Sequence, residues 1–293
     1  MKNIGIIVNR TKDIDLIYTN LLVRCLSDKE CNVFIDKETS KSLGLKECFL
    51  NQKEVINKSD IIICLGGDGT FLKTARETYL KNIPILGINL GTLGFLTEIE
   101  KDKIDFATSL IVNNDYVIEE RMMLKVRVIR DGNTLYEDIA LNDIVISRSS
   151  ISRIIELKTY VDSDFVDSFP GDGIIISTPT GSTAYSLSAG GPIVEPNSDI
   201  IIITPICPHM LNSRSYVINS NRKVKAMFDD GYILEAVITI DGQVVYKVKE
   251  NDVIEVEKGE FKVKFIKINN RNFYDILRSK LYGRGGNSKK NEI

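Results

Sequence analysis

Apolar residues follow two different periods in the first third of the chain. Short continuous apolar runs, rich in β-branched side chains, are typical of strands buried on both faces of a sheet. These runs occupy residues 4–8, 32–35, 61–65 and 83–88. Segments with apolar positions at helical spacing alternate with them, at residues 13–27 and 71–80. The alternation predicts an α/β domain with a parallel, Rossmann-like sheet and helices on both faces.

Beyond about residue 118 the apolar period changes to two, which is typical of strands with one buried face. Asp-Gly pairs at 131–132, 230–231 and 241–242 are turn signals between such strands. The pattern predicts a mainly-β, β-sandwich-like second domain that one short helix interrupts. The predicted strands are 124–128, 143–147, 154–161, 174–177, 200–204, 233–240, 253–256 and 261–268, and the helix is 183–189.

These patterns set the predicted domain boundaries. Residues 1–117 form the α/β domain and residues 118–269 the β-rich domain. Apolar residues return to helical spacing near the end of the chain, so we expect a helix over about 270–282 that docks on the first domain. Residues 283–293 are Gly-rich and polar, and are predicted to be a flexible tail.

Composition narrows the classes of function. The net charge of -2 argues against a broad nucleic-acid surface, and no apolar stretch approaches the ~18 residues that span a membrane. The five cysteines contain no CxxC pair, which argues against a disulfide framework or a zinc site. The start of the chain is too quickly polar for a signal peptide. We therefore predict a cytoplasmic protein that binds neither nucleic acid nor membrane, without a metal site built from its own residues.

A glycine-rich loop follows the third predicted strand and precedes a helix: Gly66-Gly67-Asp68-Gly69-Thr70. Its glycines allow close approach of the backbone to a phosphate, and the next helix offers free N–H groups to an anion. Asp68 would repel that anion unless it accepts a proton or holds Mg²⁺. Lys73, one turn later, can add positive charge. The alternative is an ordinary turn in which Asp68 caps the helix; the loop is neither a Walker A motif nor a dinucleotide GxGxxG.

Three further segments carry candidate chemistry. Residues 171–185 place a run of Ser and Thr after a strand, which can present hydroxyl and N–H groups to a polar ligand, and Tyr185 can stack on a base. Residues 87–96 contain recurring glycines and Phe95, whose alternative role is core packing. Asn142-Asp143 opens a strand and, taken alone, indicates a turn.

Together these motifs resemble those of bacterial NAD kinases, in the same order and over residues 4–281. The segments that carry the resemblance are 65–70, 89–96, 141–143, 171–185, 188–192, 204–209 and 241–243. The resemblance implies transfer of the ATP γ-phosphoryl group to the 2′-hydroxyl of the adenosine ribose of NAD, with Asp68 as general base. The GGDG element alone is shared with diacylglycerol-type lipid kinases and 6-phosphofructokinases.

The resemblance also implies roles for individual residues. Asn142 and Asp143 match a pair that contacts NAD, Asp172 matches an acid near the nicotinamide end, and residues 183–188 match the adenine and ribose segment. The phosphate loop is Gly66, Gly67, Gly69 and Thr70. The predicted substrate-binding residues are Gly69, Lys73, Phe95, Asn142, Asp143, Arg153, Asp172, Thr180, Thr183, Ala184, Tyr185, Ser186, Leu187, Ser188 and Gln243.

The implied partners are NAD, ATP and a divalent ion such as Mg²⁺, and the implied assembly is a homodimer or homotetramer. Three alternatives remain open: a related lipid or sugar kinase, a non-enzymatic NAD(P)-binding sensor, and an oxidoreductase that uses NAD. The phosphoryl donor can be ATP, another nucleoside triphosphate or polyphosphate.

Overall fold

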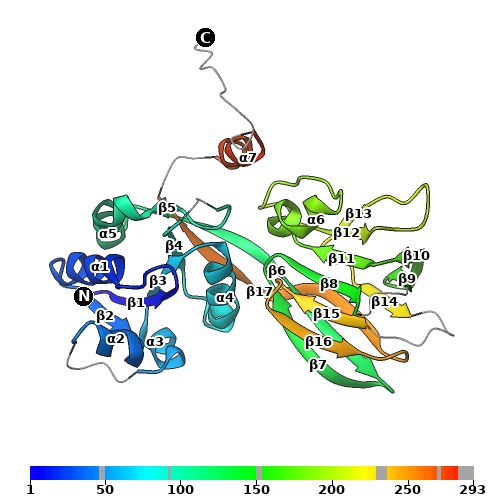
Figure 1. The fold of residues 1–293 in the computed structure, drawn as a ribbon, viewed down its shortest axis with the longest axis horizontal. Coiled ribbons are helices and arrows are strands. Elements are labelled where there is room, and N and C mark those ends of the chain that lie inside the picture. Colours follow the sequence, from blue (N-terminus) through cyan, green and yellow to red (C-terminus); the bar gives the residue numbers. More distant parts are fainter. Residues whose placement is uncertain (46–49, 92–93, 150–153, 229–235, 269–271, 283–293) are drawn as a thin grey trace, which may run out of the picture. The chain divides into compact units, whose positions relative to one another are not determined.

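The computed structural model describes residues 1–45, 50–91, 94–149, 154–228, 236–268 and 272–282 (Figure 1). The chain divides into two compact units. The first comprises Met1–Phe71, Leu86–Val117 and Ile266–Ile293, and the second comprises Leu72–Ile85 and Ile118–Phe265. The domain boundaries predicted at residues 117 and 269 stay predictions.

The first unit contains a parallel sheet. The strand order is β2-β1-β3-β4, with β5 beside β4. β1 pairs in parallel with both β2 and β3, so Ile4 lies opposite Val33 on one side and Ile61 on the other. The strands are β1 (Asn3–Val8), β2 (Asn32–Ile35), β3 (Ile61–Gly66), β4 (Ile85–Asn89) and β5 (Ile99–Glu100).

Helices follow most of these strands, and α1 and α5 contribute apolar side chains to the core of the sheet. The helices are α1 (Ile17–Ser27), α2 (Lys37–Ser42), α3 (Gln52–Lys58), α4 (Asp68–Thr78), α5 (Ile104–Asn113) and α7 (Phe273–Tyr282), with short 3₁₀ turns η1 (Tyr79–Lys81) and η2 (Lys101–Lys103). α4 begins in the first unit and continues in the second. α7 forms where a C-terminal helix was predicted, and its docking stays a prediction.

α1 begins four residues later than the apolar pattern predicted. The carboxylate of Asp13 accepts hydrogen bonds from the backbone N–H groups of Tyr18 (3.2 Å) and Thr19 (2.9 Å). These are N–H groups of the first helical turn, which lack partners within the helix. Asp13 is therefore a capping side chain outside the helix, and residues 9–13 form a connecting loop.

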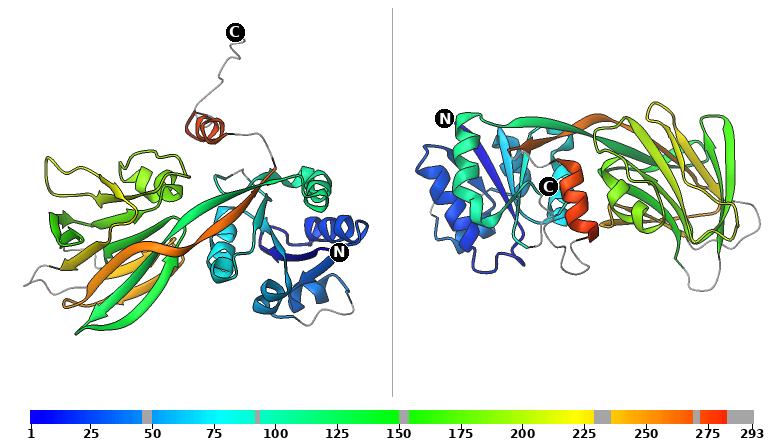
Figure 2. Two further views of the ribbon diagram at one scale, coloured as in Figure 1. Left: turned by 180° about the vertical axis from the view of Figure 1, so that it is seen from behind. Right: turned by 90° about the horizontal axis from the view of Figure 1, so that it is seen from above.

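The second unit consists of two sheets. One contains β9, β10, β14 and β17, with β6 paired to β17 and β7, and the other has the order β13-β12-β11-β8-β15-β16. Figure 2 shows β6 and β17 running side by side. The strands are β6 (Val117–Arg130), β7 (Asn133–Ala140), β8 (Asp143–Arg148), β9 (Ile155–Val161), β10 (Asp164–Gly171), β11 (Gly173–Ser177), β12 (Ile200–Ile206), β13 (Tyr216–Asn219), β14 (Val224–Phe228), β15 (Ala236–Ile240), β16 (Val244–Val248) and β17 (Val253–Lys267).

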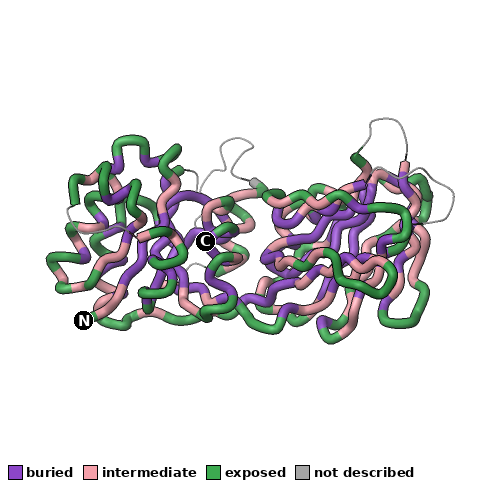
Figure 3. The backbone as a smooth tube through the Cα atoms, turned by 90° about the horizontal axis from the view of Figure 1, so that it is seen from below, coloured by how far each residue is buried: buried purple, intermediate pink, exposed green. Residues whose placement is uncertain are grey.

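One apolar core joins the inner faces of these two sheets (Figure 3). It includes Leu157 and Val224 from one sheet and Ile146 and Ile176 from the other, all fully buried. The alternation of buried and half-buried residues along β9 is the period of two that indicated a sandwich. The predicted fold class, an α/β unit and a mainly-β unit, is confirmed.

Two details of the second unit differ from the prediction. Segments 253–256 and 261–268 are parts of one strand, β17, that passes through Gly259. A Cβ atom at Gly259 would lie 2.8 Å from the hydroxyl oxygen of Tyr79, which accepts a hydrogen bond from the N–H of Phe261 (2.9 Å). The glycine therefore marks a close approach rather than a break. The predicted helix 183–189 is shorter, a 3₁₀ turn η3 (Thr180–Thr183) followed by α6 (Tyr185–Ser188).

Among the described residues, no helix is long and apolar enough to cross a lipid bilayer.

Candidate active site

Asp68 lies where β3 ends and α4 begins in the first unit. Its half-buried carboxylate accepts hydrogen bonds from the backbone N–H groups of Phe95 (2.8 Å) and Leu96 (3.1 Å). Within the described part of the chain none of its bonds goes to the N–H groups of its own helix, so it does not act as a helix cap there. The side chain is fixed against the loop that follows β4.

Glycines make this arrangement possible. A side chain at Gly94 would overlap the Asp68 carboxylate, and one at Gly66 would overlap the Thr70 hydroxyl. Gly69 is exposed, and no atom lies within 4 Å of the position that a Cβ would take there. The loop is therefore tightly packed beneath Asp68 and open at Gly69.

The carboxylate of Asp68 keeps acceptor capacity for a ligand. An ionised carboxylate has about four lone-pair sites, of which the two backbone N–H groups use two. The remaining sites can accept the proton of a hydroxyl group. A carboxylate held in one orientation with free lone pairs is what general-base catalysis requires.

A second carboxylate shapes the candidate pocket of the second unit. Asp241 lies in the turn between β15 and β16, and it is 7% exposed. It accepts hydrogen bonds from the backbone N–H groups of Leu141 (2.9 Å), Asn142 (2.8 Å) and Asp143 (3.2 Å). Because these three N–H groups converge on one side chain, Asp241 fixes the turn that places Asn142 and Asp143. Sequence reasoning treated Asp241 as a hairpin turn and missed this role.

The electrostatics of this turn are unusual. Burial, with the charge of Asp241 as a second cause, raises the pKa of Asp143 to about 7. Burial also raises the pKa of Asp241, although its three backbone N–H donors and Arg76 oppose the rise. Carboxyl groups with shifted pKa values are common in binding and catalytic sites.

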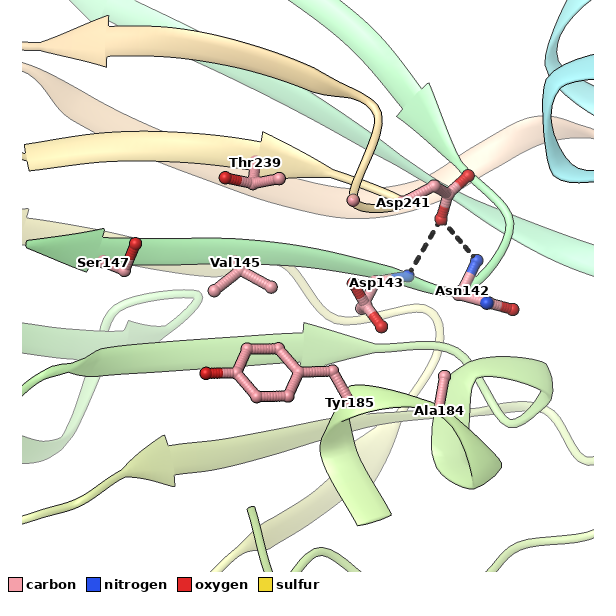
Figure 4. A pocket seen from close by; sticks show the side chains of 9 residues that line it. Asn142, Asp143, Val145, Ser147, Ala184, Tyr185, Thr239 and Asp241 are labelled. Atoms are coloured by element: carbon pink, nitrogen blue, oxygen red, sulfur yellow. Dashed lines mark hydrogen bonds between the residues drawn. The ribbon is translucent and has the colours of Figure 1, made fainter. Parts of the chain in front are cut away.

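These residues line a pocket of about 380 Å³ in the second unit. This is near the lower end of the ~300–1,000 Å³ range of small-molecule sites, so it suits one nucleoside better than a whole dinucleotide. Figure 4 shows the Tyr185 ring lying opposite Val145 and Ser147 of β8. The pocket is lined by Asn142, Asp143, Val145, Ser147, Ala184, Tyr185, Thr239, Asp241 and Gly242.

Asn142 gives the pocket an unused acceptor. Its side-chain oxygen is buried and has no hydrogen-bond partner among the described residues. A buried polar atom without a partner costs free energy, so a ligand that donates to it gains affinity. Tyr185 is 45% exposed, which leaves its ring available for stacking.

The hydroxyl-rich segment after β11 is held by hydrogen bonds to other elements of the second unit. Thr178 Oγ1 donates to the carbonyl of Leu141 (2.6 Å), and the hydroxyls of Ser186 and Thr204 are 3.1 Å apart. Thr180 is buried and accepts a hydrogen bond from the Arg121 guanidinium (3.3 Å). Ala184 and Tyr185 reach the pocket, whereas Thr180, Thr183, Ser186, Leu187 and Ser188 do not line it.

The other predicted residues lie elsewhere. Asp172 accepts a hydrogen bond from Arg148 Nε (2.6 Å), a partner that the sequence did not indicate. Lys73 and Gln243 line a second pocket of the second unit, of about 450 Å³, together with Arg76, Glu77, Asp138 and Val244. Phe95 contributes its backbone N–H to Asp68 in the first unit, and Arg153 lies outside the described residues.

No group of three or more His, Cys, Asp or Glu side chains in the described part of the chain is arranged to hold a metal ion.

A carboxylate held at a glycine loop after a parallel strand, and a nucleoside-sized pocket with a few polar groups, are together typical of a phosphotransferase that acts on a nucleotide. The ATP-NAD kinase N-terminal domain model matches residues 4–116, and the ATP-NAD kinase C-terminal domain model matches residues 141–268. The chain belongs to the ATP-NAD kinase family, as its sequence motifs indicated.

Individual relatives agree with this assignment. The chain is 48% identical to an NAD kinase of Acetivibrio thermocellus, over 99% of this chain and 100% of that protein. An Archaeoglobus fulgidus NAD kinase solved with ATP is similar with a TM-score of 0.73 and 26% identity, over 96% of this chain and 98% of that one. A yeast NADH kinase solved with NADH has the same fold, with a TM-score of 0.86 at 22% identity over 100% of this chain and 90% of that one.

Proposed function

We propose that this protein phosphorylates NAD, transferring the γ-phosphoryl group of ATP to the 2′-hydroxyl of the adenosine ribose to give NADP. The observation that carries the proposal is the Asp68 carboxylate, oriented by the N–H groups of Phe95 and Leu96 with lone pairs free. Family membership supports the choice of NAD as acceptor. The Archaeoglobus fulgidus relative was solved with ATP, which supports ATP as donor.

In the proposed reaction the 2′-oxygen of NAD attacks the γ-phosphorus of ATP. A new P–O bond forms to that oxygen, and the bond between the γ-phosphorus and the β–γ bridging oxygen breaks. ADP leaves with the bonding electron pair, and the proton of the 2′-hydroxyl passes to Asp68. Because phosphoryl transfer depends mainly on positioning and charge neutralisation, a single oriented base suffices for the proton.

The pocket of the second unit is proposed to bind a nucleoside part of NAD. Tyr185 stacks on the base, and the side-chain oxygen of Asn142 accepts a hydrogen bond from an N–H or O–H group of the nucleoside. The Asp143 carboxyl group accepts a hydrogen bond from a ribose hydroxyl. The remaining predicted substrate-binding residues are proposed to contact other parts of NAD. They are Asp172, Thr180, Thr183, Ser186, Leu187, Ser188 and Gln243.

Mg²⁺ is proposed to enter as the counter-ion of ATP. Magnesium commonly keeps several waters and binds through substrate phosphates, so the reaction does not require a cluster of protein ligands. Lys73, with 61% of its side chain exposed, is proposed to contribute positive charge to a substrate. A homodimeric or homotetrameric assembly and a cytoplasmic location are further proposals.

The direct test is to incubate the protein with NAD, ATP and MgCl₂ and to measure NADP with a dehydrogenase that requires the 2′-phosphate. The proposal predicts that NADP and ADP accumulate in equal amounts. Absence of NADP, with NAD still bound in a calorimetric titration, would favour a dinucleotide sensor. Phosphorylation of a diacylglycerol or a hexose in place of NAD would favour the kinase alternatives.

A further inference from the structure

Arg76 forms a largely buried ion pair in the second unit. It lies in the part of α4 that belongs to this unit, and its Nη2 atom is 2.7 Å from Oδ2 of Asp138 in β7. Only 14% of the Arg76 side chain and 20% of the Asp138 side chain are exposed. Removing one partner of a buried pair leaves an uncompensated charge and is strongly destabilising, whereas exposed pairs contribute little. The pair therefore holds β7 firmly at Asp138.

The Asp138 carboxylate is fixed at both of its oxygens. Oδ2 also accepts a hydrogen bond from the Tyr136 hydroxyl (2.7 Å), and Oδ1 accepts one from the backbone N–H of Ile139 (2.8 Å). The Tyr136 ring stacks on the ring of Tyr246, with centroids 4.4 Å apart and an angle of 18° between the ring planes. Because Tyr246 belongs to β16, the network that Arg76 anchors joins β7 to β16.

Both strands lead directly to the turns that shape the nucleoside pocket. β7 ends at Ala140, and the next residues, 141–143, donate their three backbone N–H groups to the carboxylate of Asp241. β16 begins at Val244, three residues after Asp241. The network therefore holds the strand that enters the Asn142–Asp143 turn and the strand that leaves the Asp241 turn.

Arg76 acts on the nucleoside pocket without lining it, as far as the described residues show. It borders the second pocket, of about 450 Å³, together with Gln243, whereas the preceding residue, Gly242, lines the nucleoside pocket. Burial raises the pKa of Asp241, and the positive charge of Arg76 is one of the causes that oppose this rise. The charge thus favours the ionised carboxylate, which accepts hydrogen bonds at both oxygens.

We propose that Arg76 is a positioning residue for the nucleoside part of NAD. By holding Asp138 it fixes the end of β7, and the end of β7 fixes how Asn142 and Asp143 face the ligand. Arg76 needs no contact with the ligand itself, so its loss weakens NAD binding and largely preserves the turnover of bound NAD. This role rests on the proposed function and adds to it a residue that the sequence motifs did not indicate.

The test compares Arg76→Met with wild-type protein and with Lys125→Met. Lys125 pairs with Glu137, the neighbour of Asp138 in β7, at 2.9 Å, but the side chains of that pair are 30% and 49% exposed. The control therefore removes an ion pair to the same strand from a more exposed position. Calorimetry measures the Kd for NAD with the full chain, and steady-state kinetics gives kcat and the KM for NAD.

We expect Arg76→Met to raise the Kd and the KM for NAD by about 10-fold, with kcat within about threefold of wild type. Lys125→Met should match wild type in all three quantities. Arg76→Lys should restore most of the NAD affinity. The guanidinium makes one hydrogen bond to Asp138, and its buried Nε has no partner in the part of the chain that the structure describes. A lysine ammonium can supply a single bond of this kind and keeps the charge.

If Arg76→Met does not fold, the double variant Arg76→Met/Asp138→Asn takes its place, because it leaves no buried charge without a partner. Three results would overturn the proposal: wild-type NAD affinity in a folded variant without Arg76, a loss confined to kcat, or an equal loss of NAD affinity in Lys125→Met. The binding measurement is independent of turnover. Wild-type protein that binds NAD in a way that depends on Arg76 but forms no NADP would refute the kinase function and leave the positioning role standing.

Discussion

Gly94 lies directly against the carboxylate of Asp68, at a distance that leaves no room for even a methyl group between them. The N–H groups of the next two residues, Phe95 and Leu96, hold the same carboxylate. The position of the proposed base therefore depends on a glycine 26 residues later in the chain as much as on its own loop. A change at Gly94 should therefore affect catalysis without affecting the binding of NAD.

Replacing Gly94 by alanine should displace the Asp68 carboxylate. A misplacement of about 1 Å can lower a rate by about 100-fold, so we expect kcat for NADP formation to fall by about that factor. The pocket of the second unit is unchanged by the substitution, so the dissociation constant for NAD should stay within about twofold. Steady-state kinetics and calorimetric NAD titration check both expectations. Wild-type kcat in a folded Gly94→Ala protein would show that Asp68 does not need its present position.

The role of Asp241 can be isolated with a matched turn elsewhere in the same unit. Asp131 and Asp241 have nearly the same backbone angle, φ 50° and 49°, and each precedes a glycine with positive φ. Asp131 is exposed, whereas Asp241 is buried and accepts three backbone N–H groups. Alanine meets the same backbone strain at either position. Any additional loss of stability at position 241 therefore measures what the hydrogen bonds of Asp241 contribute.

We expect Asp241→Ala to lower the free energy of unfolding by at least about 3 kcal/mol, since each unsatisfied buried donor costs about 1–3 kcal/mol. Asp131→Ala should cost at most about 1 kcal/mol, because alanine tolerates the left-handed conformation less well than aspartate does. Urea unfolding at fixed pH measures both. Equal losses in the two variants would mean that the Asp241 carboxylate does not hold the turn.

Asp143 predicts a pH dependence of stability. Its pKa is raised from 3.8 to about 7 in the folded protein, so between about pH 4 and 7 the folded state binds a proton that the unfolded state has released. The free energy of unfolding must then fall as pH rises through this window. The full displacement corresponds to about 4 kcal/mol. Asp143→Asn cannot ionise and should lack this component, so its stability relative to wild type should rise from pH 4 to pH 8. A pH-independent difference between the two proteins in urea unfolding would contradict the assignment.

The sequence located the glycine loop correctly because its signal is local. A buried apolar run predicted a strand at 61–65, and the structure has β3 at Ile61–Gly66, with Asp68 at the start of the next helix. The partners of Asp68 could not be predicted, because the two N–H groups that hold it lie 27 and 28 residues away.

Asp241 shows the same limit for the site. An Asp-Gly pair indicates a turn, but whether the carboxylate faces water or three N–H groups depends on a segment about 100 residues earlier. The apolar spacing predicted a helix from Asp13, whereas Asp13 caps α1 from the preceding loop. Two strands were predicted at 253–256 and 261–268 where the structure has one. The contact that Gly259 makes with the Tyr79 hydroxyl could not be predicted, because Tyr79 comes from a distant helical turn.

The most direct test of the account is NADP formation by Asp68→Asn, with Asp60→Asn as control. Asp60 is an exposed aspartate of the same unit that also accepts a backbone N–H, from Asn3 at 3.0 Å. Rapid-quench measurement of a single turnover on bound NAD should show a rate at least about 100-fold lower for Asp68→Asn, with NAD affinity retained and with Asp60→Asn equal to wild type. A folded Asp68→Asn protein that forms NADP at the wild-type rate would show that this carboxylate does not accept the ribose proton.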